Sequence, residues 1–219
     1  MSQSALSEQM LTVLDHPLIR TKMTVLRNKQ TPPDQFRRTL HEMTGLMSFA
    51  VFAHLHTDPV SVDTPLETTA GEALQQPVPC LLSILRAGNG IVDALSALLP
   101  DAAVGHLGVQ RDPVTHKPIY YCEKLPPEID KRQVIIADPM LATGGSAIMA
   151  ADHLTKKGCR GLVLSALSPP RKVWPHSTPL ILIFRSLPPL LTGNWMKTVI
   201  FCLAWVTPVT GFITRSEAA

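Results

Sequence analysis

The sequence predicts an α/β fold with a mainly parallel, twisted sheet that is flanked by helices. Short apolar runs alternate with segments of helical periodicity between residues 79 and 168. Two of these runs pass into a helical segment through a glycine-containing turn. Strands that alternate with helices in this way form parallel, doubly wound sheets, whose ligands bind at the C-terminal ends of the strands.

The length of the chain is that of one substantial domain, or of a domain with a small appendage. Of its 219 residues, 45% are apolar and 17% are charged, so the chain can bury a core and is not disordered. The net charge of +3 comes from scattered Lys and Arg residues and gives no reason to expect a nucleic-acid partner. The chain has no run of about 18 apolar residues, so we expect no membrane span.

The cysteines and the N-terminal segment indicate a cytoplasmic protein. Cys80, Cys122, Cys159 and Cys202 lie far apart, with no C-x-x-C pair that would suggest a zinc or redox site. Free, mostly buried thiols are typical of a reducing compartment. The segment Met1–Met10 is polar and lacks the basic start and the apolar core of a signal peptide.

The first half of the chain predicts helices followed by a strand and another helix. Residues 16–52 indicate a helical region, within which the turn Thr31–Asp34 has the signature of a helix start. Residues 60–66 alternate weakly and predict an edge strand or one arm of a hairpin. The apolar run 79–85 predicts a strand, and the glycine-containing turn after it leads into a helix over 91–99.

The second half continues the alternation. Residues 103–109 and 118–124 predict two strands joined by a long hairpin. A further buried strand, 134–138, is followed by a turn and by a helix over 146–157. Residues 161–167 predict the last buried strand.

The segment Val134–Ser146, which reads VIIADPMLATGGS, carries the clearest chemical signal. Its strand delivers the carboxylate of Asp138 to the edge of the sheet, and its glycines let backbone N–H groups point inward at the positive end of a helix. The hydroxyls of Thr143 and Ser146 add donors. The N–H groups and hydroxyls suit a phosphate. The carboxylate of Asp138 would repel a phosphate but would accept hydrogen bonds from sugar hydroxyls. Together these groups predict a sugar-phosphate site. The structural alternative is a glycine-rich βα turn with an N-capping serine.

The stretch DPMLATGGS at residues 138–146 resembles the ribose-5-phosphate loop of uracil phosphoribosyltransferases. The similarity extends over about residues 12–168 and includes, in order, His16–Ile19, Leu26-Arg27, Phe36-Arg37, Thr64–Leu66, Ser83–Gly90 and Lys124–Pro126. The resemblance implies a type I phosphoribosyltransferase-like fold with a long β-hairpin arm. It also implies a pentosyltransferase of pyrimidine salvage that converts uracil and phosphoribosyl diphosphate (PRPP) to UMP and diphosphate. A homo-oligomer, magnesium bound mainly through PRPP, and GTP binding are further implications.

The resemblance also assigns PRPP-binding residues. They are Arg86, Arg111, Asp138, Pro139, Met140, Leu141, Ala142, Thr143, Gly144, Gly145 and Ser146. Arg86 matches the arginine that contacts the diphosphate in the family, and Arg111 matches the arginine that opens the family's long hairpin. The alternative for each is an ordinary surface arginine. Fixed guanidiniums suit a leaving diphosphate, which gains charge as its bond breaks. The hairpin departs from the family at Pro113-Val114, where an acidic residue is usual. No residue resembles a covalent nucleophile.

The tail from Pro169 onward has a different composition. It holds seven of the 20 prolines and all three tryptophans, and it has no acidic residue before Glu217. The family's uracil-binding segment near the C-terminus, which reads approximately GYIxPGLGDAGD, is missing from it.

The genetic code accounts for the missing segment. When the possible codons are read from their third base, Trp195-Met196 gives Asp and Trp205-Val206 gives Gly. The remaining codons of residues 194–211 permit LDENGYILPGLGDAGDR, and those of residues 169–174 permit the family's Ala-Pro-Glu-Gly. We therefore predict that the reading frame slipped by one base near Ser168-Pro169; the alternative is a divergent but selected tail. Resequencing the DNA at this position distinguishes the two.

The predicted organisation is a phosphoribosyltransferase domain over residues 1–168 and an aberrant tail over residues 169–219. Two functional classes follow: a uracil phosphoribosyltransferase, or an inactive remnant that at best binds PRPP. A shifted frame has not been selected for folding, so the tail should pack poorly and leave the sheet without the strands that normally complete it. Its apolar run 199–206 would then be an aggregation hazard.

Overall fold

The computed structural model describes residues 11–14, 16–112, 118–139, 145–159, 161–167 and 182–185 of the chain. Within these residues, a seven-stranded sheet has the order β1-β9-β8-β7-β4-β5-β6. Its four central strands are parallel neighbours: β8 (Leu162–Ala166), β7 (Val134–Ala137), β4 (Cys80–Ile84) and β5 (Ala103–Arg111). The outer strands are antiparallel: β6 (Pro118–Lys124), β9 (Leu182–Arg185) and β1 (Leu11–Val13).

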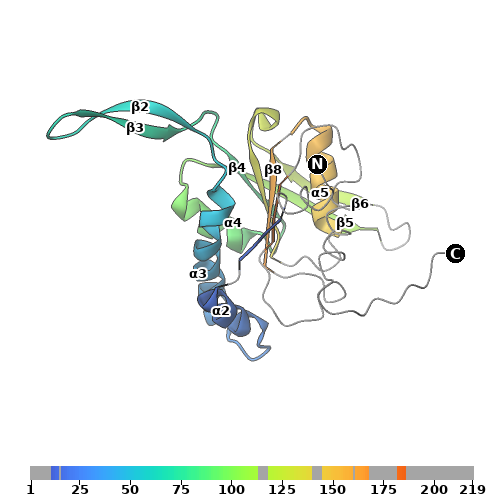
Figure 1. The fold of residues 1–219 in the computed structure, drawn as a ribbon. Helices are drawn as coiled ribbons and strands as arrows, with labels where there is room; N and C mark the ends of the chain where they lie inside the picture. Colours follow the sequence, from blue (N-terminus) through green and yellow to red (C-terminus); the bar gives the residue numbers. More distant parts are fainter. Residues whose placement is uncertain are drawn as a thin grey trace, which may run out of the picture.

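Helices cover both faces of this sheet (Figure 1). On one face lie α2 (Pro17–Arg27), α3 (Pro33–Phe52) and α4 (Asn89–Leu98), and on the other lies α5 (Gly145–Lys156). We call α2, α3 and α4 the first layer. Successive strand residues point to opposite faces of the sheet, so Leu81 and Ile135 pack against the first layer while Leu82 and Ile136 pack against α5. All residues of β4, β7 and β8 are buried, which explains why these strands are apolar apart from Ser83 and Ser165. The predicted α/β class with a mainly parallel sheet is confirmed.

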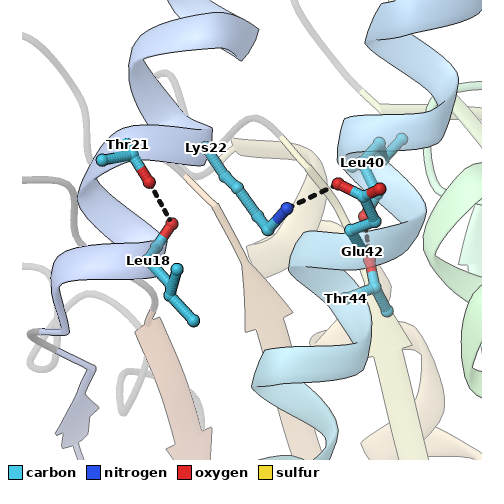
Figure 2. Close-up of polar contacts among 6 residues, drawn as sticks. All are labelled: Leu18, Thr21, Lys22, Leu40, Glu42 and Thr44. Carbon is cyan, nitrogen blue, oxygen red and sulfur yellow. Dashed lines mark hydrogen bonds and ion pairs between the residues drawn. The ribbon is translucent and has the colours of Figure 1, made fainter.

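The helical region predicted over residues 16–52 divides into α2 and α3. His16 caps α2, since its Nδ1 accepts a hydrogen bond of 3.2 Å from the backbone N–H of Leu18. Pro33 occupies the first position of α3, where its missing N–H costs nothing. An ion pair of 2.5 Å between Lys22 Nζ and Glu42 Oε2 joins the two helices (Figure 2).

A two-stranded arm of β2 (Thr57–Asp63) and β3 (Thr68–Leu74) projects from the helical layer and the sheet (Figure 1). At its turn, the hydroxyl of Thr64 donates a hydrogen bond of 2.6 Å to the carbonyl of Glu67. The weak alternation over residues 60–66 therefore belongs to a hairpin arm and not to an edge strand of the main sheet. A short 3₁₀ turn, η1 (Ile129–Lys131), precedes β7.

The structure corrects one expectation about the tail. Residues 182–185 form β9, which pairs with β8 and also with β1, so the tail does supply a strand to the sheet. Strand pairing uses backbone N–H and C=O groups, and a short apolar run such as Leu-Ile-Phe can therefore join an open edge without the family's sequence. The rest of the tail, including the run 199–206, lies outside the described residues.

Candidate active site

The C-terminal ends of β4 and β7 bring candidate residues to one edge of the sheet. The two strands are adjacent and parallel, with Ser83 opposite Ala137. Asp138 follows β7 directly, and Arg86 lies two positions after the last residue of β4. The chain thus leaves both strands at the same edge, where ligands bind in parallel α/β sheets.

Asp138 and the start of α5 lie as the sequence predicts. Asp138 follows the last strand residue and is only 8% exposed, and its backbone N–H donates a hydrogen bond of 3.1 Å to the carbonyl of Ser165. The helix begins at Gly145, so Ser146 lies in its first turn, as expected. The N–H groups at a helix N-terminus attract anions, and the first turn of α5 has no acidic residue to compete with one. Such an end can bind a phosphate.

The turn that carries Arg86 packs tightly against the end of β7. Gly88 is buried in this turn, and a Cβ there would lie 2.3 Å from the carbonyl oxygen of Ala137. Only glycine permits this approach. The side chain of Ser83 donates a hydrogen bond of 2.7 Å to Oδ1 of Asn89, which ties β4 to the first residue of α4. Arg86 itself is exposed and so is available to a ligand at this edge.

Several of the predicted site residues are described only in part. Arg111 is the last residue of β5 and pairs with Pro118 of β6, but its side chain lies outside the described residues. The loop Met140–Gly144 and the hairpin tip at Pro113-Val114 lie entirely outside the described residues. The prediction that Arg86 and Arg111 face the phosphate loop across one cleft therefore stays a prediction.

The cysteines of the described segments are free thiols, as expected. Burial raises the pKa of Cys80 to about 12 and also raises the pKa of Cys159. Both thiols are therefore protonated at neutral pH and are poor nucleophiles. Among the described residues, no group of three or more His, Cys, Asp or Glu side chains could hold a metal ion.

A cavity of about 110 Å³ lies elsewhere, at the base of the arm. Its lining includes His56, Gln75, Lys131 and Gln133. Gln133 precedes β7, so the cavity lies at the opposite end of the strands from Asp138. It has no part in the candidate site.

Sequence reasoning did not single out Tyr121, whose ring covers Gly108 of β5. The hydroxyl of Tyr121 lies 3.4 Å from the carbonyl oxygen of Leu85, at the start of the turn that carries Arg86. The local sequence contains no signal for this contact, because it depends on the pairing of β5 with β6.

Comparison of this chain with known proteins identifies its family. Residues 13–171 match the family model of uracil phosphoribosyltransferase. A uracil phosphoribosyltransferase of Dictyoglomus thermophilum is 47% identical over 153 residues, which are 70% of this chain and 74% of that relative. One of Paracoccus denitrificans is 44% identical over 152 residues, covering 69% and 72% of the two chains.

Among solved structures, the AQ2163 protein from Aquifex aeolicus is similar, with a TM-score of 0.65 and 28% sequence identity over 71% of this chain and 74% of that one. About a quarter of each of these relatives has no counterpart here. The family match ends at residue 171, close to Pro169, where the composition of the chain changes.

Proposed function

Because this chain belongs to the uracil phosphoribosyltransferase family, we propose that its domain transfers the phosphoribosyl group of PRPP to uracil, with UMP and diphosphate as products. The observation that carries the proposal is the adjacency of β4 and β7. It brings the turn of Arg86, the carboxylate of Asp138 and the N-terminus of α5 to one edge of the sheet.

Each group has a chemical role that fits this transfer. The loop Asp138–Ser146 would bind the ribose phosphate, with N–H groups of the helix N-terminus directed at the phosphate. Asp138 would accept hydrogen bonds from the ribose hydroxyls. Arg86, together with Arg111, would stabilise the charge that collects on the departing diphosphate. The transfer needs no covalent enzyme intermediate, so the contribution of the protein is positioning, charge stabilisation and exclusion of water.

Magnesium fits the donors at this edge, and we propose it as the cofactor. Magnesium binds oxygen ligands and is commonly held by one or two carboxylates together with substrate phosphates. Asp138 places a carboxylate at this edge, and the described residues contain no group of three or more His, Cys, Asp or Glu side chains that could hold a metal ion. The metal would therefore be bound mainly through PRPP. Its chemistry would be to neutralise the diphosphate.

We further propose that the protein is a homo-oligomer. Every residue of β2 is exposed, and Leu66 at the tip of the arm is 96% exposed. An isolated two-stranded hairpin is marginally stable in water, so a partner surface that covers the arm would stabilise it. Sedimentation should give a mass of at least two chains, and deletion of residues 58–73 should reduce it. A monomeric full-length chain would contradict this proposal.

GTP binding stays a prediction from the resemblance, and a cytoplasmic location stays a prediction from the cysteines and the N-terminal segment. In the segments that the structure describes, no helix has the length and apolar character needed to cross a membrane.

The activity is tested by comparing the chain as written with a version whose frame is corrected at Ser168-Pro169. The family match ends at residue 171, so the alternative for the chain as written is a remnant that binds PRPP but not uracil. We expect the corrected version to form UMP. The chain as written should bind PRPP more weakly, should not bind uracil, and should be less stable and less soluble. A similar rate of UMP formation by both versions would mean that the tail is a functional replacement.

The role of Arg86 is tested in the frame-corrected version. Arg86→Ala should lower kcat/KM by about a hundredfold, the effect of removing one donor that stabilises transition-state charge. Because Arg86 is exposed, its removal should change the unfolding midpoint little. Unchanged kinetics would remove Arg86 from the proposed diphosphate site.

A further inference from the structure

An extra residue in β6 allows two of its side chains to face α5. Leu107 and Val109 of β5 belong to the apolar cluster beneath α5. Their partners on β6 are Glu123 and Tyr120, respectively. The register shifts between Gly108 and Val109, so a step of two residues on β5 matches a step of three on β6. Cross-strand partners point to the same face, and this β-bulge therefore turns both Tyr120 and Glu123 towards α5.

These two side chains contact one stripe of the helix. Glu123 Oε1 accepts from Nζ of Lys157 at 2.5 Å, and Glu123 Oε2 lies 2.9 Å from Nε2 of His153. The rings of Tyr120 and His153 contact each other at a tilt of 32°, with their centroids 4.6 Å apart, and the Tyr120 hydroxyl donates to the carbonyl of Met149 at 3.1 Å. Met149 and His153 are one turn apart on one side of α5. Lys157 follows at the same interval, directly after the last helix residue, and its backbone N–H donates to the carbonyl of His153 at 3.2 Å.

Most of the fully buried side chains of α5 are small. The buried residues are Gly145, Ala147, Ala150, Ala151 and Leu154, and the longer Ile148 and Met149 pack partly buried against the same apolar cluster. Small side chains let a helix approach a sheet closely, but they interdigitate little and so resist rotation and sliding weakly. The polar contacts with β6 therefore add directional restraints to the few long apolar side chains that hold α5.

Tyr121, the additional residue of the bulge, points to the opposite face of β6. There it covers Gly108 and reaches the carbonyl oxygen of Leu85, which precedes Arg86. Strand β6 thus contacts α5 with side chains on one of its faces and the turn of Arg86 with Tyr121 on the other face. These are the two elements that lead to the candidate phosphate and diphosphate contacts.

We propose that Tyr120 and Glu123 are positioning residues for PRPP, because they set the rotation and axial position of α5 and so aim the N–H groups of its first turn at the phosphate. This inference rests on the proposed function and deepens it. The direction of those N–H groups follows the helix axis, and a misplacement of about 1 Å at a site of this kind can cost about a hundredfold in rate.

Variants of the full chain separate positioning from folding. Glu123→Gln removes the charge that attracts Lys157 and His153 while it keeps the volume of the side chain. Tyr120→Phe removes the hydroxyl that bonds to Met149 but keeps the ring. The control is Glu42→Gln, because Glu42 forms an ion pair of the same length, 2.5 Å, with Lys22 in the helical layer on the other face of the sheet (Figure 2).

Two measurements are made on each variant. Calorimetry gives the Kd of PRPP in the presence of magnesium, and hydrogen exchange without PRPP follows the amides of residues 145–147. We expect Glu123→Gln and Tyr120→Phe each to raise the Kd by about two- to tenfold, the equivalent of one or two hydrogen bonds, and to accelerate exchange at these amides. Glu42→Gln should change neither quantity, even if it lowers Tm as much as the other two variants do.

A lowered Tm in Glu123→Gln or Tyr120→Phe with unchanged Kd and unchanged exchange would overturn the proposal, since the contacts would then serve stability alone. Failure of the chain without these substitutions to bind PRPP, both as written and with its frame corrected, would instead refute the proposed function. In that case, exchange at residues 145–147 still decides whether β6 positions α5: acceleration confined to the two β6 variants supports it, and equal exchange in all variants overturns it.

Discussion

The two helical layers of this protein are held to the sheet in different ways. The layer of α2, α3 and α4 buries long side chains, among them Met43, Met47, Ile91 and Leu95, all fully buried. The buried side chains of α5 are mostly alanines, and the helix is completed by polar contacts with β6. Long interdigitating side chains contribute most of the stability that a layer can supply, whereas small ones allow close approach and leave orientation to polar groups. The comparison suggests that one face of the sheet stabilises the fold and the other aims the site.

The largest loss of folding stability is expected when a buried side chain of the first layer is truncated. Met47 is fully buried, so Met47→Ala should lower the free energy of unfolding by about 2–5 kcal/mol through lost burial and a cavity. Urea titration measures this loss. Under conditions where the variant is still folded, the Kd of PRPP should stay within about twofold of the original, because Met47 lies in α3, which carries none of the candidate site residues. A loss of stability below about 1 kcal/mol would mean that the first layer is no more important than α5.

An intermediate effect is expected where the turn of Arg86 meets β7. A Cβ at Gly88 would lie 2.3 Å from the carbonyl oxygen of Ala137 and 2.8 Å from the backbone nitrogen of Ile84. Backbone atoms cannot move aside cheaply, so Gly88→Ala should destabilise the protein by about 1–3 kcal/mol and also weaken PRPP binding.

The matched control for that substitution is Gly45→Ala. Gly45 lies within α3, and nothing comes within 4 Å of a Cβ built there. Alanine at this position should stabilise the helix by about 0.5–1 kcal/mol and leave PRPP binding unchanged. Loss of stability in Gly45→Ala equal to that in Gly88→Ala would show that the close approach at Gly88 is not the cause.

The smallest effect on folding stability is expected from lowering the pH. The hydrogen bond from Lys157, and secondarily the one with His153, lowers the pKa of Glu123. A carboxyl whose pKa is lower in the folded state stabilises the fold above its unfolded pKa and loses that contribution as the pH falls through the folded value. Because the side chain is 35% exposed, solvent screening keeps the contribution small.

This acid effect is measured as a difference between two chains. Urea midpoints of the original chain and of Glu123→Gln should differ at neutral pH and converge below about pH 4. A constant difference over this range would mean that the ionised Glu123 does not stabilise the α5 layer.

The elements that the sequence predicts most closely have local signals. The strand predicted over 134–138 is observed as Val134–Ala137, and the helix predicted over 146–157 as Gly145–Lys156. The second strand of the arm, Thr68–Leu74, has no prediction, because TTAGEAL shows no alternation of apolar and polar residues. It is a strand because its backbone pairs with Thr57–Asp63. The same holds for Leu182–Arg185, which joins the sheet through β8 and β1.

By itself, the sequence determined the α/β class, the order of the buried strands along the chain, and the place of Asp138 and Ser146 between a strand and a helix. These follow from hydrophobic periodicity and from glycine-containing turns, which a short window of residues contains. Only the tertiary structure decided that β4 lies beside β7, which brings the turn of Arg86 to Asp138, and that a bulge turns Tyr120 and Glu123 to one face. The physical reason is that strand neighbours and register depend on backbone hydrogen bonds and on burial between segments far apart in the chain, and no local pattern records either.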